Sequence, residues 1–233
     1  HDYFKMKSEE LPRPKSWMPG PVAPWALLQP DDRSLLIATV EKYLEVRPSF
    51  SPKTDIPNLT ERPAAVLVPF ITTDGQTIDS VIVTTRTMTV NSHKGEVSFP
   101  GGRIEEDETE QTTALREAKE EINLDPSVVK IIGQSSLTQT RSKLSQITPF
   151  VGVINEADLG ELIPSNEEVE TIHIVNIGQL LAPDNYSSEV WDFGEITATI
   201  HMYRVFDINN QPVFIWGATA HILTGILHCL SES

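Results

Sequence analysis

The chain has very little cysteine: Cys229 is the only one among its 233 residues. A single thiol cannot form an internal disulfide, and it cannot supply a cysteine cluster for a structural zinc ion. The sequence therefore excludes a fold that depends on disulfides or on a cysteine-rich zinc site. Cys229 lies in an apolar C-terminal segment with a helical pattern, where we expect it to be packed as a small hydrophobic side chain.

Long apolar runs are also missing. No run reaches the roughly 18 residues that a membrane-spanning helix needs. The first 30 residues contain no continuous apolar core of the kind that signal peptides carry. The final residues Ser231, Glu232 and Ser233 differ from the Ser-Lys-Leu type of peroxisomal address. We therefore expect no membrane partner and a cytoplasmic location.

Positive charge is scarce as well. The chain carries 18 basic and 33 acidic residues, which gives a formal net charge of −15 at pH 7. Proteins that bind nucleic acids or anionic membranes present a basic face, so this composition argues against both kinds of partner. An anionic small-molecule substrate would have to be attracted by a few local arginine and lysine side chains, against the overall field.

The most informative segment that is present is an acidic run in the middle of the chain. From Gly102 it reads GRIEEDETEQTTALREAKEEINL, with a helical pattern from about Thr109. At about 100° per residue, Glu117, Glu120 and Glu121 share about a 100° arc of this helix. A neighbouring arc is apolar and can face a core; it consists of Ala114, Leu115, Ala118 and Ile122. The helix therefore has one packed side and one side of crowded negative charge.

Crowded carboxylates favour a metal site. They repel one another unless a cation offsets their charge, and Mg²⁺ and Mn²⁺ both accept oxygen ligands and can bridge carboxylates to phosphates. Arg116 can hold Glu120, four residues away, by a charge-assisted hydrogen bond. Gly101 and Gly102 lack a Cβ, so their backbone could approach a metal closely. Most charge runs are merely solvated, but here a strand-like segment, 97–99, and the glycines precede the helix, as a functional motif requires.

This run resembles the Nudix box, the motif of hydrolases that cut a diphosphate linked to another group. The matching positions are Gly102, Glu108 and the segment 116–124, in which Asn123 replaces the usual glycine. The resemblance implies an α/β fold of the Nudix α/β/α sandwich type, with a mixed central sheet between helices. It also implies Mg²⁺ or Mn²⁺ as the cofactor, and as metal ligands Glu117, Glu120, Glu121 and the backbone carbonyl of Gly101.

A second resemblance lies just upstream of the box. Residues 82–87 and 93–102 resemble the motif of the coenzyme A pyrophosphatase branch of Nudix hydrolases. Thr87 stands where that branch has Ser or Ala, and Asn91 stands where it has Arg. The resemblance implies hydrolysis of coenzyme A or an acyl-CoA to 3′,5′-ADP and 4′-phosphopantetheine or its acylated form.

Further candidate site residues surround the two motifs. Arg86 is expected to bind phosphate, because arginine forms two-pronged hydrogen bonds with phosphate oxygens; the alternative is an exposed arginine at the end of a strand. By the family resemblance, Glu168 is a candidate base or metal ligand on a loop beyond the box, and otherwise a solvated carboxylate. Arg116 would orient Glu117 or Glu120. Additional positive charge for the substrate would come from His93, Lys94 and Arg103.

The chain divides into an N-terminal arm, helix and linker over residues 1–60 and a Nudix hydrolase domain over residues 61–233. We expect the arm to pack through Trp17 and Trp25, and either to cover the substrate entrance or to form a homodimer contact. Periodicity predicts helices near 33–46, from 109, near 177–182 and near 217–230. It predicts strands near 64–72, 78–86, 128–137, 146–154, 169–175, 195–206 and 212–216.

Two other functions stay open at this point. One is a Nudix hydrolase for another nucleoside diphosphate derivative, such as ADP-ribose, NADH or a nucleotide sugar, and Asn91 keeps it open. The other is a catalytically inactive Nudix domain that only binds nucleotides. Such domains usually lose box glutamates, whereas this chain retains all three.

Overall fold

The computed structural model describes residues 2–29, 33–46, 63–88, 95–139, 146–194 and 196–231. Within these residues the helices are α1 (Asp2–Glu9), α2 (Ile37–Val46), α3 (Glu110–Ile122), α4 (Ile177–Leu181) and α5 (Gly217–Leu227). Short 3₁₀ turns lie at Pro24–Leu27, Pro126–Val128, Glu156–Asp158, Pro183–Asn185 and His228–Ser231.

Eight strands form the large sheet. They are β2 (Ala64–Thr72), β3 (Ser80–Arg86), β4 (Val97–Ser98), β5 (Gly101–Arg103), β6 (Lys130–Gln134), β7 (Thr138–Gln139), β8 (Gln146–Asn155) and β9 (Val169–Asn176). The main path runs β4-β3-β2-β8-β6, and β5, β7 and β9 pair with β2, β8 and β3. The sheet is mixed, because β2 and β8 are parallel and the other pairs are antiparallel.

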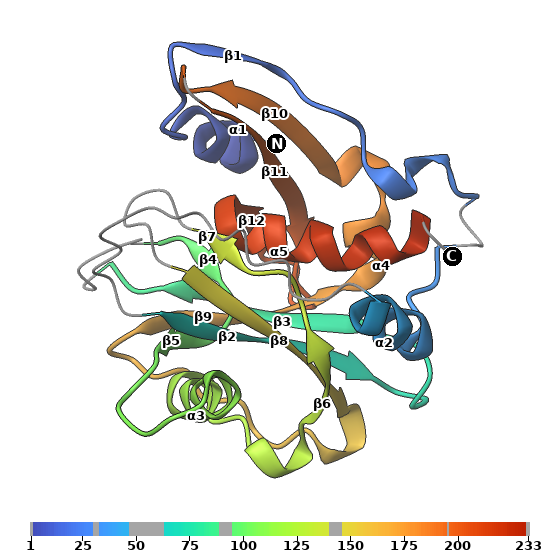
Figure 1. The fold of residues 1–233 in the computed structure, drawn as a ribbon, viewed down its shortest axis with the longest axis vertical. Coiled ribbons are helices and arrows are strands. Elements are labelled where there is room, and N and C mark those ends of the chain that lie inside the picture. The colour runs from blue at the N-terminus through green and yellow to red at the C-terminus, as the bar shows by residue number, and fades with distance from the viewer. Residues whose placement is uncertain are drawn as a thin grey trace.

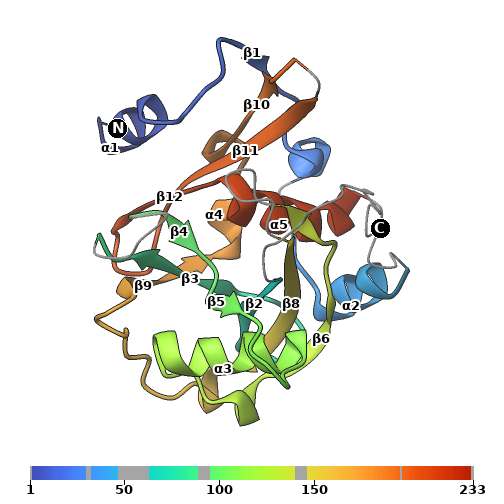
Figure 2. The ribbon, with the colours of Figure 1, turned by 60° about the vertical axis from the view of Figure 1, so that its left-hand side comes forward.

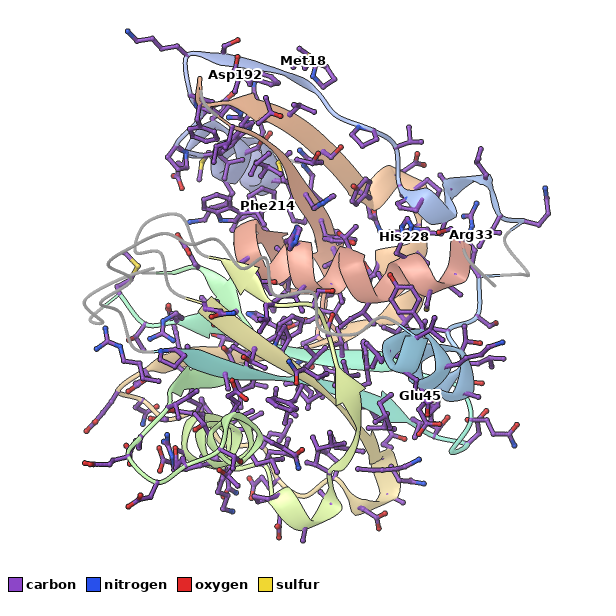
Figure 3. The ribbon with its side chains drawn as sticks, in the orientation of Figure 1. Met18, Arg33, Glu45, Asp192, Phe214 and His228 are labelled. Carbon is purple, nitrogen blue, oxygen red and sulfur yellow. The ribbon has the colours of Figure 1, made fainter. Side chains whose placement is uncertain are left out.

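A second, antiparallel sheet has four strands in the order β1-β10-β11-β12. They span Ser16–Pro19, Tyr186–Asp192, Thr197–Phe206 and Pro212–Trp216. Figure 1 shows the layers: α3 lies below the large sheet, α5 lies above it, and the small sheet rises beyond α5. Figure 2 shows the same order of layers from another direction. The α/β class with a mixed sheet between helices is confirmed, and the separate small sheet is a feature that the sequence pattern did not predict.

The large sheet is buried on both faces, which explains why β2 is an almost unbroken apolar run. Ala65 and Leu67 pack with α3, in a cluster that also contains Ala114, Ala118 and Ile122. The alternate residues Val68 and Phe70 pack toward α5 and the small sheet, in the largest apolar cluster. Alternate side chains of a strand point to opposite faces, so the catalytic helix candidate α3 is fixed to one face by ordinary core packing.

The N-terminal arm corrects part of the sequence prediction. It contains the helix α1 and the strand β1, neither of which we predicted, and β1 pairs with β10, also not predicted. Trp25 is fully buried, as expected, whereas Trp17 is 47% exposed and the Arg13 guanidinium lies over its ring, at 5.1 Å from the ring centre. The predicted boundary near residue 60 lies outside the described residues. No helix in the described ranges is long and apolar enough to cross a membrane.

A buried ion pair holds the arm to the small sheet. The Arg13 guanidinium donates to both carboxylate oxygens of Glu189 on β10, at 2.8 Å from Nε to Oε2 and 2.8 Å from Nη2 to Oε1. The Trp191 indole also donates to Glu189 Oε2, at 2.7 Å. Burial raises the pKa of Glu189, but these hydrogen bonds outweigh it and leave that pKa below its usual range.

We expect Arg13→Met to reduce the free energy of unfolding by about 3 kcal/mol near pH 7, because it leaves a buried carboxylate without its partner. A carboxyl group with a depressed folded-state pKa contributes stability above its unfolded pKa of about 4.3, and that contribution is lost as the pH falls. The difference between wild type and variant should therefore shrink below about pH 4. Urea unfolding of both proteins at several pH values measures this difference in the free energy of unfolding.

The matched control is Lys5→Met, because Lys5 and Glu9 form a surface pair at 4.0 Å with both side chains mostly exposed. Its effect should stay within about 0.5 kcal/mol at every pH. Equal losses for the two variants would show that the Arg13–Glu189 pair does not hold the arm.

Candidate active site

The acidic helix α3 is well defined at both ends. Thr109 caps its N-terminus: its hydroxyl accepts from the Thr112 backbone N–H, at 3.2 Å. Asn123 ends the helix in the left-handed region, with φ of 58°, a conformation that Asn tolerates almost as glycine does. The Asn123 side chain also donates to the backbone carbonyl of Glu161, at 3.1 Å. Asn123 therefore preserves the turn at the position where the Nudix box has glycine.

Arg116 gathers three carboxylates on the outer side of α3. Its Nε lies 2.7 Å from Oε1 of Glu108, and its Nη1 lies 3.0 Å from Oε1 of Glu117 and 2.9 Å from Oε2 of Glu120. Its Nη2 donates to the backbone carbonyl of Arg103, at 3.3 Å. Hydrogen bonds from Arg116 and from the Thr113 hydroxyl lower the pKa of Glu108 to about 2. Arg116 thus contacts both of the glutamates that we expected it to orient.

Glu121 occupies a different environment, on the inner side of the helix. Its side chain is 3% exposed, and Oε1 has no hydrogen-bond partner among the described residues. Oε2 accepts from the Gly101 backbone N–H, at 3.2 Å, and Nη1 of Arg86 lies 3.7 Å from Oε1. Burial raises the pKa of Glu121 to about 8, although Arg86 and the Gly101 hydrogen bond partly offset it. Burial likewise raises the pKa of Glu117, which Arg116 partly offsets.

Gly101 and Gly102 bring β5 close to this cluster. A Cβ on Gly102 would lie 2.5 Å from Cδ of Glu117, and a Cβ on Gly101 would lie 2.6 Å from Cα of Val66 on β2. Both distances are too short for a real side chain. The two glycines therefore let the backbone pass between β2 and the glutamates of α3.

Arg86 and Glu168 complete the constellation. Nη2 of Arg86 lies 3.8 Å from Oε2 of Glu168, whose side chain is 52% exposed. The loop that carries Glu168 is docked on the end of α3, because the Ser165 backbone N–H donates to the Glu121 carbonyl at 2.8 Å. Arg86 is thus paired with carboxylates from two elements, and it is not the exposed strand-end arginine of the alternative interpretation.

Comparison with known proteins now identifies the family. The NUDIX domain family matches residues 61–193. A protein of Enterobacter sp. named "Uncharacterized Nudix hydrolase NudL" is 32% identical over 79% of this chain and 91% of its own length. This chain belongs to the Nudix hydrolase family.

Other Nudix relatives align over less of their own length. "Nudix hydrolase 15, mitochondrial" of Arabidopsis thaliana is 37% identical over 61% of this chain, and "Nudix hydrolase 3" of Caenorhabditis elegans is 40% identical over 50% of it. The matched regions span 50% and 48% of those two proteins, about half of each. Among solved structures, a MutT/nudix family protein from Enterococcus faecalis covers 81% of this chain and 72% of its own, with a TM-score of 0.44 and 16% identity.

Nudix hydrolases generally use divalent metal ions, and the donors here fit such an ion in kind. Hard cations prefer oxygen donors, and the site offers several: the buried Glu121 Oε1, which accepts no hydrogen bond from the described residues, the nearby carboxylates of Glu117 and Glu168, and the glycine backbone. As the side chains stand, no three acidic, histidine or cysteine residues in the described ranges form a complete metal-binding group. Arg116 holds Glu117 and Glu120, so both would have to turn from it to bind a cation.

The structure also places the remaining predicted residues. Arg103 contributes its backbone carbonyl to Arg116, while its side chain is exposed. His93, Lys94 and Asn91 lie outside the described residues, so the expected substrate contacts of the first two stay predictions. The sequence analysis assigned no role to one residue, Glu108, although it is a position of the motif. Glu108 makes the shortest ion-pair contact of Arg116, at 2.7 Å from Nε to Oε1.

Proposed function

We propose that this Nudix protein hydrolyses the diphosphate of coenzyme A or an acyl-CoA to 3′,5′-ADP and 4′-phosphopantetheine or its acylated form. One observation carries the proposal. Arg86, from the segment that resembles the coenzyme A branch motif, reaches Glu121 of the Nudix box and Glu168 of the later loop. The upstream segment and the box therefore lie together, so that a guanidinium suited to phosphate is beside carboxylates suited to a metal ion.

The residues have separate tasks in this proposal. A bound Mg²⁺ or Mn²⁺ would neutralise charge on the diphosphate and make a water molecule more acidic. Glu117, Glu120, Glu121 and the Gly101 carbonyl would hold the metal, and Arg116 would keep the glutamates oriented between turnovers. Arg86 would exchange its weak carboxylate contacts for two-pronged hydrogen bonds to phosphate. Glu168, partly exposed and close to Arg86, would accept the proton of the attacking water.

Two positions that differ from the branch motif, Thr87 and Asn91, bear on which substrate the site selects. Thr87 differs from the branch motif but is accounted for: its hydroxyl donates to the Glu167 carbonyl at 3.0 Å and so holds the loop before Glu168. Asn91 stands where the branch motif has arginine, which favours a second candidate, another nucleoside diphosphate derivative such as ADP-ribose, NADH or a nucleotide sugar. The retained glutamates disfavour an inactive nucleotide-binding module. A cytoplasmic location and a homodimer stay predictions.

Incubation with coenzyme A, acetyl-CoA, ADP-ribose and NADH tests the proposal, with Mg²⁺ or Mn²⁺ and with products identified by mass. We expect 3′,5′-ADP from coenzyme A, at a rate at least about tenfold above that from ADP-ribose, because one lost or gained set of polar contacts is worth at least about 1.4 kcal/mol. Parallel reactions in EDTA are the control and should be inactive. AMP from ADP-ribose or NADH, with coenzyme A intact, would favour the second candidate.

A further inference from the structure

A buried hydrogen-bonded chain crosses three elements on the face of the large sheet opposite α3. The Thr85 hydroxyl on β3 lies 2.8 Å from Nε2 of His173 on β9, and Nδ1 of His173 lies 2.8 Å from Oδ2 of Asp207, directly after β11. His173 and Asp207 are both buried. Because a carboxylate only accepts, Nδ1 donates to Asp207, and in the neutral ring Nε2 accepts from Thr85. His173 thus joins Thr85 on β3 to Asp207 through its two ring nitrogens.

Asp207 is a rigid anchor for this chain. Its second oxygen, Oδ1, accepts from the backbone N–H groups of Asn209 and Gln211, at 2.9 Å each, so the carboxylate belongs to the turn between β11 and β12. The same turn is fastened to β9, because the Ile208 N–H donates to the Ile174 carbonyl at 2.9 Å. The imidazole of His173 therefore has little freedom to rotate.

The other end of the chain lies next to the site. The pairing of β3 with β9 changes register between Thr85, opposite Thr171, and Arg86, opposite Val169. Such a bulge re-aims the side chain that follows it. Thr85 points toward His173, so Arg86, the next residue, points to the opposite face, toward α3. The backbone of Arg86 is held by hydrogen bonds with Glu96 and Gly95, at 3.0 Å each, and the Thr85 side chain adds a constraint on the residue before it.

We propose that Asp207 and His173 are positioning residues for catalysis: through Thr85 they hold the β3 bulge so that Arg86 faces the substrate diphosphate. This rests on the proposed function in one respect, the phosphate contact of Arg86. Without the Thr85 hydrogen bond, the backbone at the bulge could shift and the Arg86 guanidinium would adopt a wider range of positions. Displacements of about 1 Å are enough to reduce catalysis strongly.

Three single variants separate positioning from general stability. Thr85→Val removes the hydroxyl and keeps the shape, and it should lower kcat/KM about tenfold. Thr85→Ser keeps the hydroxyl and should restore the wild-type value. Thr224→Val is the matched control, because the Thr224 hydroxyl on α5 also makes a short hydrogen bond to a ring side chain, Tyr203, at 2.7 Å and fully buried, whereas that of Thr85 is partly buried. It should lower the melting temperature about as much as Thr85→Val and leave kcat/KM unchanged.

A double-mutant cycle tests whether the effect passes through Arg86. In an Arg86→Met background, Thr85→Val should change kcat/KM by less than about twofold, since residues that act as one unit are not additive. The same four proteins are titrated with α,β-methylene-ADP and Mg²⁺ by calorimetry, which measures diphosphate binding without turnover. Thr85→Val should weaken binding about tenfold in the wild-type background only.

The outcomes distinguish this proposal from the function on which it rests. A full Thr85→Val effect in the Arg86→Met background, or an equal kinetic loss in Thr224→Val, would overturn the positioning role. Arg86→Met with unchanged kinetics and binding would also overturn it, while hydrolysis of coenzyme A by the wild type would leave the proposed function intact. Coupled effects on α,β-methylene-ADP binding in a protein that hydrolyses no coenzyme A would support positioning and count against the proposed function.

Discussion

Glu121→Gln is expected to lower kcat about a thousandfold, equivalent to about 4 kcal/mol of transition-state stabilisation. The substitution keeps the shape of the side chain but replaces the buried Oε1, which has no hydrogen-bond partner among the described residues, or Oε2, which accepts from the Gly101 N–H. A neutral amide is a far poorer ligand for a hard cation than a carboxylate. The variant should therefore lose the contribution of the metal to catalysis. Steady-state kinetics with saturating Mg²⁺ measures the loss.

The same variant should remain folded, and this separates its effect from a defect in the core. Burying the Glu121 carboxylate is costly, and its attraction to Arg86 at 3.7 Å offsets part of that cost. Replacing it with an amide removes both contributions, so the free energy of unfolding in EDTA should change by less than about 1 kcal/mol.

Glu110→Gln provides the matched control, because Glu110 lies on the same helix in its exposed first turn. It should leave kcat unchanged. A melting temperature for Glu121→Gln that falls by more than about 8 °C would indicate that Glu121 is mainly structural.

Local sequence signals were sufficient for the elements that build the site. The bounds of β2 coincide with the predicted strand 64–72, because both faces of β2 are buried and its residues are apolar up to Thr72. The helix α3 begins one residue after Thr109, as its pattern indicated, because the cap and the core-facing alanines lie within it. The arc shared by the three glutamates followed from helical geometry alone.

The missed elements depend on partners that are distant in the sequence. The strand β10 carries Glu189 on a buried position, which weakens its apolar pattern, and the residue that satisfies this carboxylate, Arg13, is 176 positions away. The pairing of β1 with β10 has the same origin. Neither could be derived from periodicity, because the stabilising contact is absent from the segment itself.

The site likewise contains some features that the local sequence predicts and others that depend on residues distant in the sequence. The proximity of Arg86 to Glu121 joins two elements and could be expected only through the family resemblance. Glu108 offered a usable signal, since its fixed place in the motif between Gly102 and Arg116 has no explanation within the helix. A charged residue that a motif keeps outside its helix is best interpreted as the partner of an oppositely charged residue on that helix. For Glu108 that partner is Arg116.

Gly102→Ala is expected to lower kcat about a hundredfold while the protein remains folded. The new methyl group would lie 2.5 Å from Cδ of Glu117, so the carboxylate, which is the end of a flexible side chain, must move away. In the proposed function, Glu117 could then no longer bind the same cation as Glu121. Its contact with Arg116 would also change, because the two lie 3.0 Å apart. The metal dependence of kcat should shift to higher Mg²⁺ concentration.

Gly101→Ala, at the adjacent position, should mainly reduce stability, whereas Gly102→Ala should mainly reduce kcat. Its methyl group would lie 2.6 Å from Cα of Val66, and a backbone atom inside a sheet cannot move aside. We expect a loss of about 3 kcal/mol in the free energy of unfolding, from overpacking against β2. Urea unfolding and Mg²⁺ titration of kcat on both variants separate the two effects. Equal stability losses in both would mean that Gly102 serves strand packing, and that Glu117 does not depend on it for its position.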